Sequence, residues 1–233
     1  MAIVVLLFGG MTFARNAVWK DNATLFGNTL ERSPNAPFVQ VMVAALQTED
    51  DAASQEAERH YRKAATDAAQ EVPPDRVNMG IAYKGLAAIY SARGEYDRGL
   101  EMLSRAREAA PDDREIDGEQ GLILSQAGRW DEAAIYLQKA AAHSADDANV
   151  LNALGIHEQQ RNRQLDKAIA YFQRALSAHA AADSFAASVH NNLGSVYGEL
   201  ARYADAIEQF RAAIAIAPGD PEYHVNLATA LAD

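Results

Sequence analysis

The chain has 233 residues, 49% hydrophobic and 23% charged, a composition that excludes a disordered chain. It has 32 acidic and 21 basic residues and a formal net charge of −11, and its basic clusters are short, so nucleic-acid binding is not expected. The absence of cysteine excludes disulfides, thiolate catalysis and cysteine-ligated zinc.

Residues 1–14 begin with an uncharged apolar run that ends at Phe13. The run is shorter than the ~20 apolar residues of a membrane-spanning helix, and no basic residue precedes it as in a signal peptide. Arg15, Trp19 and Lys20 follow, and such residues are typical of a membrane boundary. We therefore predict the end of a truncated membrane span. The alternative is an N-terminal helix that packs against the next helix.

Small residues recur at a constant interval along the rest of the chain. Ala87, Gly121 and Gly155 lie 34 residues apart, and Gly194 follows Gly155 after 39. The clearest copy of the pattern contains Leu193, Gly194, Tyr197, Ala206, Phe210, Ala213 and Pro218. We expect the small side chains to let paired helices touch and the large ones to fill the space between neighbouring pairs.

This pattern resembles the tetratricopeptide repeat, a pair of helices about 34 residues long. The resemblance implies an all-α fold, a right-handed superhelical solenoid of antiparallel helix pairs. Abundant alanine agrees with a helical chain, since alanine has the highest helix propensity. Gly94 and Gly128 are expected to end their first helices in the left-handed conformation.

The repeat register divides the chain into eight segments. Two are an apolar segment at 1–14 and a junction with a lone second helix at 15–36. The remainder are a degenerate repeat plus linker at 37–79, repeats at 80–113 and 114–147, a repeat with insertions at 148–186, a repeat at 187–220, and the first helix of a truncated repeat at 221–233. The extra residues of the fourth repeat are expected near 161–164 and 180–185.

The junction carries a second resemblance. Phe26 and Pro34 lie where a second helix has its aromatic residue and its closing proline. The string from Arg15 to Phe26, followed by Ser33-Pro34-Asn35-Ala36, resembles the junction before the repeats of transmembrane-and-tetratricopeptide-repeat proteins, which are glycosyltransferase-like membrane proteins. This resemblance implies a membrane-anchored full-length protein with extracytoplasmic repeats. A cytoplasmic location is the alternative.

No motif of catalysis or of metal binding is present in the sequence. The six histidines lack metal-ligand spacing, and HExxH, GxSxG and phosphate-binding glycine loops do not occur. His190 and His224 lie 34 residues apart and are expected to fill the position usually held by tryptophan. Acidic pairs such as Asp112 and Asp113 are expected at helix starts, where they favour the helix dipole. We predict no catalytic residue, no cofactor and no metal.

Polar side chains on the first helices are the candidate partner-binding residues. In the tetratricopeptide-repeat family these helices line a concave groove, and the residues around Leu-Gly point into it. Amide groups there can bind the backbone of an extended peptide. The alternative is that they are solvated surface residues. The candidates are Gln126, Asn149, Asn152, Gln160, Asn191, Asn192, Ser195 and Asn226.

The sequence therefore predicts a non-catalytic scaffold that binds a protein or an extended peptide segment, with membrane contact through the apolar N-terminal segment. Its setting stays open among three alternatives. The chain is the extracytoplasmic arm of a membrane glycosyltransferase, an accessory part of a glycosyltransferase active site completed by residues absent from this chain, or a free adaptor or oligomerisation scaffold.

Overall fold

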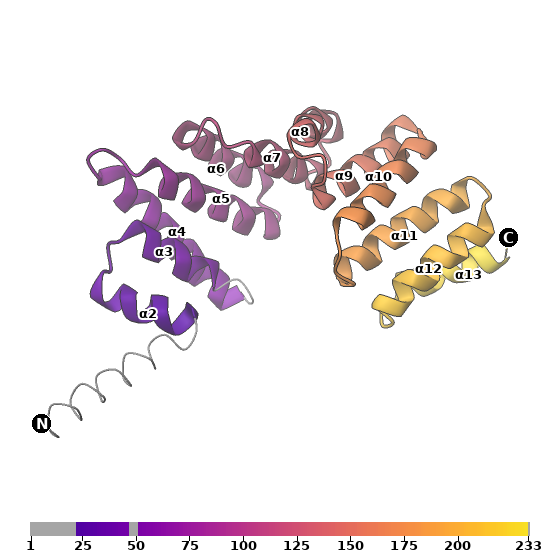
Figure 1. Cartoon of the computed structure of the whole chain (residues 1–233), viewed down its shortest axis with the longest axis horizontal. Coiled ribbons are helices and arrows are strands. Elements are labelled where there is room, and N and C mark those ends of the chain that lie inside the picture. Colours follow the sequence, from indigo (N-terminus) through magenta and orange to yellow (C-terminus); the bar gives the residue numbers. More distant parts are fainter. Residues whose placement is uncertain (1–21, 47–50, 233) are drawn as a thin grey trace, which may run out of the picture. The chain divides into compact units, whose positions relative to one another are not determined.

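The computed structural model describes residues 22–46 and 51–232, and every regular element in these ranges is a helix (Figure 1). The predicted all-α fold is confirmed. The predicted apolar segment 1–14 lies outside the described residues, as do Arg15, Trp19 and Lys20.

The helices are α2 (Asn22–Arg32), α3 (Pro37–Ala45), α4 (Asp51–Gln70), α5 (Arg76–Ala92), α6 (Tyr96–Ala109), α7 (Glu115–Gln126), α8 (Trp130–His143), α9 (Ala148–His157), the π-helix η1 (Glu158–Asn162), α10 (Leu165–Ala178), α11 (Ser184–Glu199), α12 (Tyr203–Ile216) and α13 (Pro221–Ala232).

The chain forms two compact units, unit 1 (Met1–Ile116) and unit 2 (Asp117–Asp233). In unit 1, α3 packs against α4, α4 against α5, and α5 against α6. In unit 2, α9 packs against α10, α11 against α12, and α12 against α13. Within each unit, consecutive helices run antiparallel (Figure 1), so a first helix and its second helix form a hairpin that stacks on the next hairpin of the same unit. Among the helices of the described ranges, none is both long and apolar enough to cross a membrane.

Glycines end two of the first helices. Gly94 and Gly128 have φ angles of 75° and 73°, which glycine adopts without the steric cost of a side chain. The residue after each glycine donates back into the helix, as Glu95 does to the carbonyl of Tyr90 at 2.8 Å. The predicted left-handed turns are therefore confirmed. Ala201 has a φ angle of 56° after α11, a left-handed position without glycine that the sequence did not indicate.

Aspartates begin several of the first helices. The Asp147 carboxylate accepts from the backbone N–H groups of Asn149 and Val150 at 3.0 and 3.1 Å, at the start of α9. The carboxylate of Asp113 accepts from the N–H of Glu115 at 3.0 Å, at the start of α7. These bonds satisfy N–H groups that have no partner inside a helix. The predicted place of Asp113 at a helix start is confirmed.

Small residues let the helices of a pair touch, as the repeat pattern predicts. A Cβ atom on Gly194 would lie 2.7 Å from the ring of Phe210, closer than real Cβ atoms approach. On Gly155 it would lie 2.5 Å from the ring of Phe172. A Cβ on Gly121 would meet a leucine of α8 in the same way. Each pair is therefore held by a large side chain packed directly on the backbone of its first helix.

Two helix boundaries depend on local structure. Helix α5 begins at Arg76, four residues before the predicted repeat start, because Asp75 caps it by accepting from the N–H of Asn78 at 3.1 Å. After α9 the chain continues as η1 and then turns at Arg163, which has a φ angle of 55°. A π-helix takes one residue more per hydrogen-bonded ring, so η1 accommodates an extra residue in this repeat.

Candidate functional site

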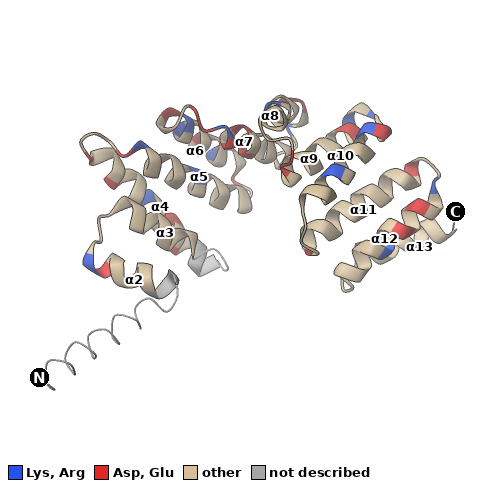
Figure 2. Cartoon of the chain, viewed as in Figure 1, with Lys and Arg blue, Asp and Glu red and all other residues tan. Residues whose placement is uncertain are grey.

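Three first helices of unit 2, α9, α11 and α13, carry few charged side chains (Figure 2). Helix α9 contains no lysine, arginine, aspartate or glutamate, and α11 and α13 contain only one glutamate each, Glu199 and Glu222. The second helices α10 and α12 contain charges of both signs. In a chain with a net charge of −11, these three first helices are therefore suited to neutral hydrogen-bonding groups.

Asparagine side chains join these three first helices. Asn192 Nδ2 on α11 donates to Asn152 Oδ1 on α9 at 3.2 Å. Asn226 Nδ2 on α13 donates to Asn191 Oδ1 on α11 at 2.9 Å, and Asn191 Nδ2 donates to Glu222 Oε1 at 3.1 Å. We call Asn152, Asn191, Asn192 and Asn226 the amide cluster. The structure thus brings together four of the eight predicted binding residues.

The amide cluster keeps part of its hydrogen-bonding capacity. Asn191 is buried, with 6% of its surface exposed, whereas the other three asparagines are half-buried. A primary amide has two donor hydrogens and one acceptor oxygen, so one bond between two amides uses only a fraction of each. Among the described residues, Asn152 Nδ2 and the Oδ1 atoms of Asn192 and Asn226 make no hydrogen bond within the protein. They are the groups that can bind a ligand.

The other four predicted residues lie outside the amide cluster. Ser195 Oγ donates to the backbone oxygen of Asn191 within α11 at 3.1 Å. Asn149 is exposed in the first turn of α9. Gln126 ends α7 and Gln160 lies in η1, and both side chains are exposed. The positions of Asn149, Gln126 and Gln160 at or beyond helix ends separate these three residues from the asparagine bonds between helices.

Glu158 and His157 are buried polar residues of unit 2 that the sequence did not indicate. Glu158 lies 34 residues after Leu124, at the position that Tyr90 and Tyr197 hold in their own repeats. Glu158 and His157 are each only 6% exposed, and His157 Nδ1 has no hydrogen-bond partner. The 34-residue interval was the signal that could have identified this exchange of a large side chain for a carboxylate.

The histidines do not form a metal site in the described part of the chain, where no three histidine, aspartate or glutamate side chains are grouped as ligands. His190 is half-buried between α11 and α12, with Nδ1 2.8 Å from Gln209 Oε1. His224 is exposed, with Nε2 2.9 Å from the carbonyl oxygen of Pro218. The prediction that both histidines fill a packing position is wrong for His224, because its ring lies against a surface turn.

Solved structures of helical-repeat proteins resemble this chain. A chain of the APC/C hetero-tetramer Cut9-Hcn1 matches 89% of it with a TM-score of 0.76 and 22% identity. YrrB, described as a TPR protein with an unusual peptide-binding site, matches 86% with a TM-score of 0.56 and 20% identity, over 96% of its own length. BtubC from P. vanneervenii matches 89% with a TM-score of 0.63 and 20% identity, over 86% of its own length. At these identities the likeness concerns the fold. The chain spans 38% of the length of the Cut9-Hcn1 chain.

A comparison with curated proteins gives no match. The resemblance of residues 15–36 to the junction of transmembrane-and-tetratricopeptide-repeat proteins is not shown by any of these comparisons and stays a prediction.

Two family models, both described as tetratricopeptide repeat, match residues 85–148 and residues 146–219. Together they cover more than half of the chain, and the helix pairs within them have the small and large residues in the expected contacts. The chain therefore belongs to the tetratricopeptide-repeat family.

Proposed function

We propose that this chain is a non-catalytic scaffold that binds an extended peptide or protein segment across α9, α11 and α13. The observation that carries the proposal is the amide cluster, in which asparagines pair between helices and still present amide donors and acceptors on a surface with few charges. A peptide backbone has the same two groups, one N–H and one C=O per residue. Amide contacts of this kind bind the main chain without reading its side chains.

The fold supports this proposal. Tetratricopeptide repeats form stacked hairpins whose repeated surfaces suit extended ligands. YrrB, which shares the fold, is described as having an unusual peptide-binding site. The low charge of α9, α11 and α13 adds a reason specific to this chain, since Glu199 and Glu222 are the only charged residues in these three helices and a peptide meets little net charge on them.

The double substitution Asn192→Ala with Asn226→Ala tests the proposal. Peptides are first selected on the wild-type chain from a phage-displayed library of random heptapeptides, and their Kd values are then measured by fluorescence anisotropy. Each lost hydrogen bond contributes about 1 kcal/mol, so we expect Kd to rise on the order of tenfold. The melting temperature should fall slightly, because both asparagines also bond between helices.

A matched control replaces Gln55 and Gln138, exposed amide side chains of the second helices α4 and α8, with alanine. This variant should retain the wild-type Kd. An Asn192→Ala, Asn226→Ala chain that remains folded and binds every selected peptide as tightly as wild type would exclude the amide cluster as the binding surface.

The resemblance of residues 15–36 favours one setting for this scaffold. We propose that the repeats form the extracytoplasmic arm of a membrane-bound glycosyltransferase and dock its protein substrate. The gene sequence upstream of Met1 tests the setting. Several membrane spans with an acidic extracytoplasmic loop support it, and an upstream region without them favours the free adaptor or oligomerisation scaffold.

A further inference from the structure

Unit 1 contains a cavity that the sequence did not indicate. Tyr83, Leu86 and Tyr90 lie along one side of α5, the side that faces the second helices α4 and α6. With side chains of those two helices they enclose a cavity of about 310 Å³, open to solvent on one side. Its charged lining is Arg62, Arg98, Glu101 and Arg105.

Aromatic rings orient the arginines of this cavity. The guanidinium carbon of Arg98 lies 4.0 Å from the centre of the Tyr90 ring, and that of Arg62 lies 5.9 Å from the same ring. The guanidinium carbon of Arg105 lies 6.0 Å from the centre of the Tyr83 ring. Cation–π contacts hold a guanidinium over a ring face and leave N–H donors at its edge for another acceptor.

The partners of these arginines differ in burial. Glu58 is 17% exposed and accepts from Arg62 Nε at 2.9 Å and from Tyr90 Oη at 2.8 Å, so the largely exposed Arg62 is paired with a largely buried carboxylate. Arg105 pairs with Glu101 at 2.7 Å, and both side chains are about half exposed. Arg98 pairs with Glu95, the half-buried N-cap residue of α6, and its own side chain is 50% exposed. Exposed pairs contribute little free energy, so a ligand carboxylate can replace Glu101 at Arg105. The guanidinium of Arg98 has five N–H donors, so it can bind the same carboxylate beside Glu95.

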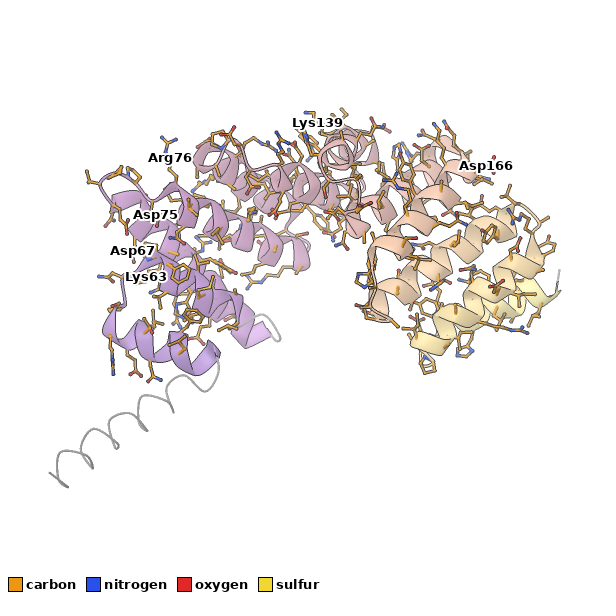
Figure 3. All side chains as sticks on the ribbon, viewed as in Figure 1. Lys63, Asp67, Asp75, Arg76, Lys139 and Asp166 are labelled. Atoms are coloured by element: carbon orange, nitrogen blue, oxygen red, sulfur yellow. The ribbon has the colours of Figure 1, made fainter. Side chains whose placement is uncertain are left out.

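A second cavity of about 430 Å³ adjoins the first and shares Tyr83 and Arg105 with it. Its remaining lining is Pro74, Arg76, Met79, Glu108 and Ala109. Arg76 lies at the start of α5, next to Asp75 (Figure 3). The two cavities together are lined by four arginines and only two glutamates, in a chain whose net charge is −11. Arg62, Arg98 and Arg105 each pair with a glutamate, so the excess of positive charge is confined to the groups that line the cavities.

We propose that these two adjoining cavities form a second binding site, which takes an acidic peptide segment. An acidic side chain of the peptide binds the guanidinium groups of Arg98 and Arg105, and an apolar side chain two residues away contacts Pro74, Met79 and Ala109. Residues two apart in an extended peptide point to the same side, about 7 Å apart, which suits cavities that share a wall. Arginine is suited to the acidic side chain because its planar fork matches a carboxylate.

This site is separate from the one in the proposed function. It lies in unit 1 between second helices, whereas the amide cluster lies in unit 2 on first helices. The interactions also differ in kind, since the arginines form ion pairs with an acidic side chain, whereas the asparagines form hydrogen bonds with a peptide backbone. A ligand of the arginine site should therefore weaken as salt concentration rises, in contrast to a ligand of the amide cluster.

The double substitution Arg98→Gln with Arg105→Gln tests the site. Among heptapeptides selected on the wild-type chain, we expect a class with Asp or Glu two positions from an apolar residue. The substitution should raise the Kd of that class on the order of tenfold or more, because each charge-assisted hydrogen bond is among the stronger ones. Glu101→Gln removes a competing carboxylate and should lower the same Kd.

The matched control is Arg59→Gln with Arg129→Gln, which removes the same charge from arginines that pair with a glutamate in their own helix turn or its cap and line neither cavity. It should leave the Kd of the acidic class unchanged, and circular dichroism should show that all variants stay folded. The proposal is overturned if no acidic class is selected, or if the Arg98→Gln, Arg105→Gln chain binds that class as tightly as the control does.

Discussion

At the scale of single residues, Glu58 of α4 connects three side chains of unit 1. It accepts from Arg93 at 2.5 Å, from Tyr90 Oη at 2.8 Å and from Arg62 Nε at 2.9 Å. Burial alone would raise the pKa of Glu58, but the hydrogen bonds from Arg93, Tyr90 and Arg62 outweigh it and lower the pKa to about 2. The carboxylate therefore links α4 to α5 as long as it remains ionised.

This low pKa predicts a loss of stability in acid. In the unfolded chain Glu58 has a pKa near 4.5, so the unfolded state takes up the proton first as pH falls. The contribution of ionised Glu58 to the free energy of unfolding is complete above about pH 4.5 and is lost as pH falls towards about 2. We expect this contribution to amount to roughly 1–2 kcal/mol after solvent screening. Urea unfolding of wild type and Glu58→Gln should therefore show a difference in unfolding free energy that becomes smaller as the pH falls from about 4.5 towards about 2.

Glu101→Gln provides the comparison, because Glu101 is 55% exposed and pairs with a single arginine. Its difference from wild type should stay small at every pH. If the difference between wild type and Glu58→Gln is the same at pH 6 and at pH 2.5, Glu58 does not link the two helices through its charge.

At the scale of helices, the contact between a glycine and a large side chain determines how closely a hairpin can close. Gly194 of α11 faces the Phe210 ring of α12, and a Cβ atom there would lie 2.7 to 3.0 Å from three atoms of the ring. The ring is only 4% exposed and is packed in the core of unit 2. It has little room to move, so any larger residue at position 194 must push the two helices apart.

Gly194→Leu is therefore expected to destabilise the chain by roughly 3 kcal/mol through overpacking, measured as a lower melting temperature. Gly198→Ala in the same helix is the control. No atom lies within 4 Å of a Cβ at Gly198, so this substitution should be neutral or slightly stabilising through helix propensity. Equal melting temperatures for the Gly194→Leu chain and wild type would show that α11 and α12 do not meet at this glycine.

At the scale of the whole molecule, stability depends on how many neighbours each hairpin has. Eight residues of α11 are buried, among them Val189 and Val196, because α10, α12 and α13 all contact this helix. Helix α13 buries only Tyr223 and Ala230, and its main contacts are with α12 and α11. The two helices belong to the same unit, and with 16 and 12 residues their lengths differ less than their numbers of buried residues do.

Hydrogen exchange should follow this difference. The amides of α13 should exchange through local opening, at least about tenfold faster than those of α11, which need a larger part of unit 2 to unfold. Mass spectrometry of peptides from the two helices measures both rates in one sample. Equal protection of α11 and α13 would contradict a stability built from contacts between neighbours, since it requires both helices to open together.

The candidate site could be predicted only in part. Helical spacing and the Leu-Gly position identified Asn152, Asn191, Asn192 and Asn226 on first helices, and these are the four residues that the structure groups. The sequence did not indicate that they bond to one another, because the distance between side chains of different repeats depends on how hairpins stack. The cavities lined by Arg98 and Arg105 were missed for the same reason, since helices α4, α5 and α6 all contribute to them.

The sequence by itself determined the helical repeat, the glycine turns and the close contacts within hairpins, because these depend on residues near one another in the chain and return at a fixed interval. Only the tertiary structure decided which polar groups meet across repeats. The amide cluster, the arginines over tyrosine rings and the buried Glu158 all depend on packing between helices, and the repeat pattern constrains the size of residues there but not their hydrogen bonds or charges.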